Sequence, residues 1–245
     1  GGSIDCLNIF NPARVTIKKN SIIELYNIKV NDKELSNSSI SCIDIESAAT
    51  RENTTIFFRE ESLYRCFESK RFSGSADMSL IKENEETIKD SMTTGAETVT
   101  IPDGFKINNL NIMDRSSRGN ITILNYGQVG SLTINKKNDV TIRNLLKADG
   151  FTKNNLANKN RISKISILCG YSGNNSSATL YCSADSGYNL VGDINSNSGA
   201  GTFKFCDNTL VKGEISGWSS STVFEDDSSF EGKASVGSIN FNSTG

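Results

Sequence analysis

The sequence predicts a mainly β protein folded as a parallel β-helix, that is, a β-solenoid with a small helical insert. One phrase recurs three times near the C-terminus, with its glycines about 20 residues apart at Gly192, Gly213 and Gly232. Each of these glycines is followed by a further short run of β-branched or aromatic residues, at 202–205, 222–224 and 238–241. A period of this length, made of strands and turns without helices, is typical of a β-solenoid.

The composition narrows the class of protein. The chain has 245 residues, a net charge of −2 and 36% hydrophobic residues. These apolar residues are spread in short β-type runs, which excludes a disordered chain. The basic residues are scattered, so we expect no nucleic-acid partner. No run of 18 apolar residues exists, so we expect no transmembrane segment in this chain.

Residues 1–58 predict an irregular N-terminal β region or cap. Short β-type runs lie at 14–17, 22–30, 43–45 and 54–58, separated by Asn, Asp and Ser residues that favour turns. The runs alternate like the C-terminal repeats but lack their regular spacing.

Residues 59–98 predict a helical insert. We expect one helix over 59–71 and a second over 75–93, with Ser75 as its N-cap and Gly95 as its stop. The apolar residues on one face of that second helix are Met78, Ile81, Ile88 and Met92.

The insert allows two interpretations. It covers an open end or flank of the β structure, or it is the variable element that faces a partner. Under the second interpretation Leu63, Tyr64 and Phe67 are partner-facing, together with Trp218, the lone tryptophan of the chain.

Residues 99–245 predict the β-helix repeats. Three-residue strands starting at Val99, Ile121, Val140 and Ile165 are interpreted as one column, and strands at 110–112, 132–134 and 179–181 as a second. About seven rungs fit between residues 99 and 241, or roughly 34 Å at about 4.8 Å per rung. An antiparallel sandwich also has many short strands, but it requires no shared period.

Residues 201–215 carry a pattern, Gly-Thr-Phe-Lys-Phe followed by Asp-Asn-Thr-Leu-Val-Lys-Gly, that is similar to a passenger-domain repeat of bacterial autotransporters. Residues 130–135 and 237–241 resemble the same family and the related filamentous-haemagglutinin repeats. The resemblance covers residues 99–245 and implies a right-handed β-helical adhesin or cytotoxin on a Gram-negative surface. It lends no catalytic residues.

The six cysteines allow two interpretations. An even number in a chain of extracellular type suggests disulfides, whereas free thiols buried in a solenoid interior are the alternative. Histidine is absent and no close Cys pair exists, so we expect no metal site and no cofactor. The cysteines are Cys6, Cys42, Cys66, Cys169, Cys182 and Cys206.

Candidate catalytic and calcium-binding residues are sparse. Glu225, Asp226 and Asp227 could act as a glycan-cleaving set with Asp207 or Glu214, but their setting predicts a solvated turn. The segment 193–199 begins like a calcium loop but lacks the glutamate at its twelfth position. Without histidine, Ser-His-Asp and Cys-His pairs are excluded.

These observations predict a non-enzymatic adhesin-like passenger fragment, secreted or on the bacterial cell surface. It would display a binding surface for a host-cell protein or glycan, or associate with itself. The alternatives are a polysaccharide-acting β-helix enzyme or phage tailspike, and a structural filament subunit. No polar cap follows the last repeat, so we expect the chain to be part of a longer protein.

Overall fold

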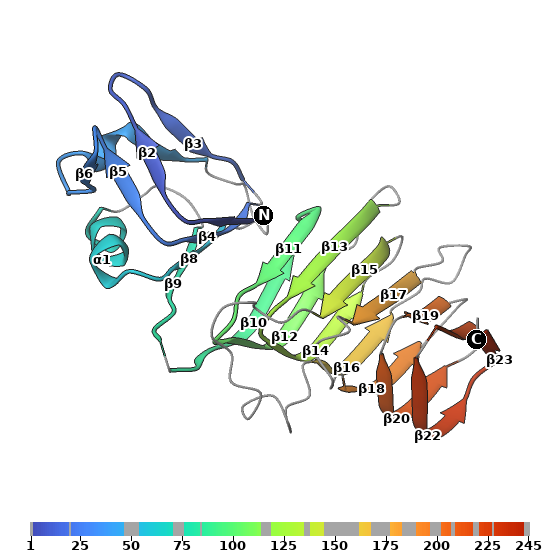
Figure 1. Ribbon diagram of the computed structural model, residues 1–245. Helices are drawn as coiled ribbons and strands as arrows, with labels where there is room; N and C mark the ends of the chain where they lie inside the picture. The colour runs from blue at the N-terminus through green and yellow to red at the C-terminus, as the bar shows by residue number, and fades with distance from the viewer. Residues whose placement is uncertain are drawn as a thin grey trace. The chain divides into compact units, whose positions relative to one another are not determined.

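The structure is a computed structural model, and it divides the chain into two compact units, Gly1–Thr87 and Ile88–Gly245. Figure 1 shows both units as stacks of short strands. Each unit is described by itself. The residues that the structure describes are 2–19, 21–46, 54–70, 76–83, 85–113, 119–134, 138–144, 162–167, 177–182, 190–196, 202–206, 209–217, 221–226 and 228–242.

The first unit is already a small parallel solenoid. Its strands form sheets in the orders β1-β4-β8-β9, β2-β5-β6 and β3-β7, and every pair except β5–β6 is parallel. Successive turns of the chain therefore stack on one another. The elements are β1 (Gly2–Ile4), β2 (Leu7–Ile9), β3 (Val15–Ile17), β4 (Ile22–Leu25), β5 (Ile28–Val30), β6 (Lys33–Glu34), the short 3-10 helix η1 (Ile40–Cys42), β7 (Ile43–Ile45), β8 (Thr55–Phe58), α1 (Glu61–Ser69) and β9 (Asp77–Leu80).

The insert contains one helix rather than two. The helix expected over 59–71 is present as α1, and Leu63 and Phe67 on its inner face join the core of the first unit. The helix expected over 75–93 is wrong. Its residues form β9 and β10, because β9 pairs in parallel with β8 and places Met78 beside Ile56. Among the described residues no helix has the length and apolar character needed to span a membrane.

The second unit consists of two parallel sheets of seven strands each, which confirms the expected number of rungs. Even-numbered strands form one sheet and odd-numbered strands the other, so each turn contributes one strand to each sheet. The first sheet contains β10 (Thr87–Thr94), β12 (Phe105–Ile112), β14 (Gln128–Ile134), β16 (Ile162–Ile167), β18 (Leu190–Ser196), β20 (Leu210–Gly217) and β22 (Ser229–Ser235). The second contains β11 (Thr98–Ile101), β13 (Gly119–Asn125), β15 (Asn138–Asn144), β17 (Ser177–Cys182), β19 (Thr202–Cys206), β21 (Ser221–Glu225) and β23 (Ser238–Asn242).

The core lies between these sheets and follows from the alternation of side chains along each strand. In β12 the buried residues include Ile107, Leu110 and Ile112, and Leu110 and Ile112 stack over Leu132 and Ile134 of β14. The C-terminal repeats align as expected: Phe205 pairs with Phe224, and Phe224 pairs with Phe241. These three rings are stacked, with centroids 4.9 and 5.0 Å apart.

Two parts of the expected register are wrong. Val99 pairs with Ile123 and not with Ile121, so the first strand of that column is shifted by two residues. The sequence pattern predicts 165–167 in the column of Val99 and 179–181 in the second column. In the structure Ile165 follows Leu132 in the first sheet, and Leu180 follows Ile142 in the second sheet. The two assignments are exchanged because the short Val/Ile strands of both sheets look alike.

The recurring glycines lie where a rung passes close to its neighbour. Gly213 pairs with Gly232, and both have positive φ, 152° and 157°. A Cβ atom on Gly232 would overlap the backbone of Gly213, so glycine is required there.

Candidate functional site

A regular column of residues, most of them polar, follows one register position of the second sheet. Four threonines occupy the same register position on successive rungs, and we call them the threonine column: Thr98, Thr122, Thr141 and Thr179. The column continues through Lys204, Val223 and Asn240. Thr98, Thr122 and Thr141 are partly exposed, whereas their neighbours Val99, Ile123 and Ile142 are buried in the core.

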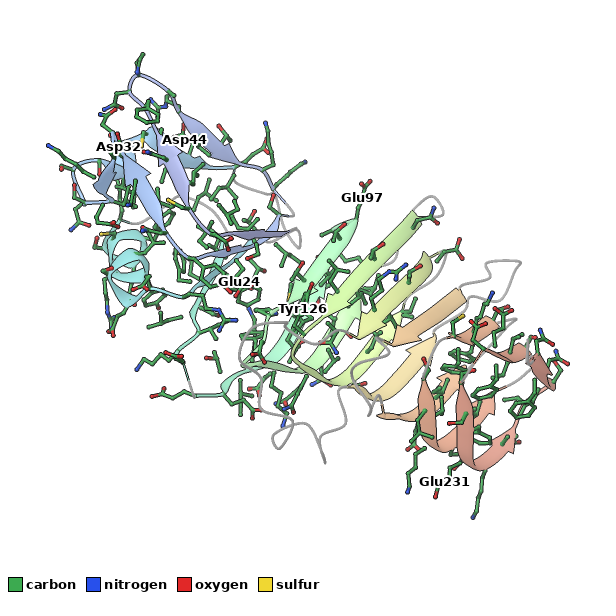
Figure 2. The ribbon with its side chains drawn as sticks, in the orientation of Figure 1. Glu24, Asp32, Asp44, Glu97, Tyr126 and Glu231 are labelled. Atoms are coloured by element: carbon green, nitrogen blue, oxygen red, sulfur yellow. The ribbon has the colours of Figure 1, made fainter. Side chains whose placement is uncertain are left out.

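The first sheet carries a similar column of small polar residues, and its described side chains are partly exposed or exposed: Asn111, Thr133, Ser216 and Ser235. These residues follow one another in register from β12 to β22, and we call them the polar column: Asn111, Thr133, Ser166, Asn195, Ser216 and Ser235. Charged side chains also pair between rungs on this sheet. Lys212 Nζ lies 3.2 Å from Glu231 Oε1, and Glu231 is labelled in Figure 2. Both outer faces therefore present polar groups at rung spacing.

A compact group of chemically active side chains lies at the ends of β19 and β21. The donor atoms of Cys206, Glu225 and Asp226 all lie within 4.8 Å of one another. Cys206 is only 2% exposed, and its Sγ is 3.9 Å from Glu225 Oε2. Lys204 Nζ lies 2.6 Å from the same carboxylate oxygen. Rung stacking brings these residues together, since residues 204–206 and 225 belong to adjacent rungs.

The structure describes some of the carboxylates that could form a glycan-cleaving set. Glu225 is paired with Lys204, and Asp226 lies in a turn with φ 53°, in agreement with the expected turn. Asp193 accepts a hydrogen bond of 2.9 Å from the backbone N–H of Glu214. Asp207, Asp227 and residues 197–199 of the calcium-like segment lie outside the described residues.

Two of the four residues expected to face a partner are buried. Leu63 and Phe67 are buried, 5% and 0% exposed, and Phe67 packs against Phe58 with ring centroids 5.0 Å apart. They belong to the core of the first unit and not to an exposed surface. Tyr64 is partly exposed, and Trp218 lies outside the described residues.

The exposed side of α1 is a small polar network. Tyr64 donates a hydrogen bond of 3.2 Å to Glu68, and Arg65 forms ion pairs with Glu68 and Glu61 at 2.6 and 3.3 Å. The hydrogen bond from Arg65 lowers the pKa of Glu68, and burial followed by the bond to Glu68 raises the pKa of Tyr64. Such exposed pairs contribute little stability, because solvent screens them.

The expectation of disulfides is wrong for the cysteines whose side chains the structure describes. Cys6, Cys42, Cys66 and Cys206 form no disulfide. Two of them donate to backbone carbonyls within the first unit: Cys42 to Ser39 at 3.0 Å and Cys66 to Leu35 at 3.7 Å. Cys169 and the side chain of Cys182 lie outside the described part of the chain.

Comparisons with protein-family models, with curated proteins and with solved structures found no match to this chain. The solenoid fold is therefore established from the structure itself, and the resemblance to autotransporter and haemagglutinin repeats concerns the sequence pattern alone.

Proposed function

We propose that this chain is a non-enzymatic binding and display module of a secreted or surface-exposed bacterial protein. The observation that carries the proposal is the threonine column, whose members repeat once per rung; Thr98, Thr122 and Thr141 are partly exposed, while the core residues beside them are buried. A parallel solenoid holds such groups at a spacing of about 4.8 Å, which is a pre-organised surface.

The partner class that fits this surface is a host-cell protein or glycan rich in hydrogen-bonding groups. Each direct hydrogen bond contributes only about 0.5–1.5 kcal/mol net, so affinity would depend on several rungs acting together. A rigid scaffold favours this, because little conformational entropy is lost when its groups bind. The polar column on the other sheet offers a comparable face and serves as the internal comparison.

The proposal is tested by saturable binding of the labelled chain to cultured animal cells. Thr122→Lys with Thr141→Lys places two long charged side chains on the threonine column, and Asn111→Lys with Thr133→Lys does the same on the polar column. We expect the first pair to abolish binding and the second to leave it within twofold. Equal binding by all three proteins would contradict the assignment of the face.

Point substitutions are preferable to removal of the insert. Deleting residues 59–94 would also remove Leu63 and Phe67 from the core and the strands β9 and β10. Arg65→Glu on the exposed side of α1 tests a contribution of the helix while retaining these contacts. We expect this variant to bind as the parent does.

Two further assays on the same protein distinguish the display module from the two alternative functions. Release of reducing ends from a glycan panel would favour a polysaccharide-acting enzyme over the display module. Concentration-dependent fibre formation, with no saturable cell binding, would favour a filament subunit.

A further inference from the structure

We infer that Cys206, Glu225 and Asp226 form a binding site for a zinc ion that would link the rungs of β19 and β21. The site is independent of the proposed display function. Among the residues that the structure describes, these three side chains bring one sulfur and two carboxylate donors within 4.8 Å of one another.

The thiol is held at the site by the fold. Cys206 is the last residue of β19 and is 2% exposed. The turn that follows β21 is tied to the end of β19, because the Ser228 hydroxyl lies 3.1 Å from the carbonyl oxygen of Phe205 and 2.5 Å from that of Glu225. This arrangement places Asp226 and Glu225 beside the buried sulfur.

The donor set determines the kind of metal. Calcium and magnesium take oxygen ligands, whereas zinc combines thiolate with carboxylate. Zinc bonds are about 2.3 Å to sulfur and about 2.0–2.2 Å to oxygen, so neighbouring tetrahedral donors lie roughly 3.3–3.7 Å apart. The side chain of Glu225 is partly exposed and that of Asp226 is exposed, so both can close the remaining distance by rotation about their side-chain bonds. A water molecule would supply the fourth ligand.

Lys204 sets the affinity of the site. Its ammonium lies 2.6 Å from Glu225 Oε2, where it compensates the charge of a carboxylate that the metal would need. Zinc must displace this ammonium, and the Cys206 thiol must release its proton to solvent on binding. Because the lysine side chain is 38% exposed, it can move into solvent without a change in the backbone.

The test is a titration of the full chain with Zn²⁺ by calorimetry, repeated with Cd²⁺ to record the sulfur-to-cadmium charge-transfer band. We expect a tight equivalent that weakens at least tenfold in Cys206→Ser and in Asp226→Asn. Cys6→Ser, a change at an exposed thiol outside the group, should leave this equivalent unchanged. Lys204→Met should tighten it several-fold, because the competing ammonium is gone.

Asp226→Asn tests the site even if Cys206→Ser fails to fold. Asp226 is exposed, so Asp226→Asn should leave the far-ultraviolet circular dichroism unchanged and still weaken binding. Absence of a tight equivalent, or a tight equivalent that is insensitive to Cys206→Ser, Asp226→Asn and Lys204→Met together, would overturn the site.

Discussion

The corner glycine Gly127 provides a sharp test of how the rungs stack. It lies between β13 and β14, directly above the corner between β11 and β12, and it is buried. A Cβ atom at this position would overlap the carbonyl oxygen of Phe105 and lie 2.6 Å from that of Pro102. Both atoms belong to the backbone of the neighbouring rung, so neither can move aside as a flexible side chain would.

The cost of Gly127→Ala follows from this geometry. Overpacking a closely packed site costs about 1–3 kcal/mol, and two backbone atoms at this distance place the expected loss near the upper limit, about 3 kcal/mol. For a unit of this size each kcal/mol lowers Tm by about 2–4 °C. The expected decrease is therefore about 6–12 °C.

Thermal and urea unfolding of the variant, followed by far-ultraviolet circular dichroism, measure this loss. Gly95→Ala is the matched control, because its nearest neighbour would be Met113 Sδ at 3.4 Å, an ordinary contact. It should change stability by no more than about 0.5 kcal/mol. Equal midpoints for the two variants would refute the stacking of these corners.

Three further predictions concern buried or paired polar groups. Thr222→Val should raise the free energy of unfolding by about 1 kcal/mol in urea titrations, because the buried Thr222 hydroxyl has no hydrogen-bond partner among the described residues; a loss of stability would contradict this. Arg59→Met should lower the free energy of unfolding by about 3 kcal/mol, because it leaves the buried carboxylate of Glu24 without the guanidinium whose Nε lies 2.5 Å away. Glu24→Leu in the same chain should restore most of this loss. The pKa of Glu68 is lowered by Arg65, so its ionised form contributes stability above the unfolded pKa, and this contribution is lost as pH falls through the folded pKa. Glu68→Gln should therefore flatten the acid side of the stability–pH curve, and an unchanged curve would count against the pair.

The fold class could be predicted from the sequence because the repeats are local and regular. The alignment of Phe205, Phe224 and Phe241 needs only a period and an alternating pattern, and the structure confirms it. The prediction of a second helix in the insert was wrong for a physical reason. Apolar residues spaced three or four apart fit a helix. However, β9 pairs with β8, which precedes α1 in the sequence, and the local spacing of apolar residues does not reveal such a non-local pairing.

The candidate sites were harder to predict from the sequence than the fold was. Cys206 and Glu225 are separated by a full turn of the solenoid, so neither a close Cys pair nor a histidine motif signals them. The exact register of the rungs brings them together. The amphipathic pattern around Leu63 and Phe67 could be recognised, but not which face of α1 is buried, because that depends on the stacked strands beneath it.

The in-register column on the outer face is the central claim, and distances between spin labels test it most directly. Labels introduced as unnatural amino acids at Thr98 and Val223 would lie five rungs apart, or roughly 24 Å at about 4.8 Å per rung. Moving the first label to Thr122 should shorten the distance by one rung, to roughly 19 Å. Distances that follow these steps would support the column. Distances that do not change between the two pairs would contradict it.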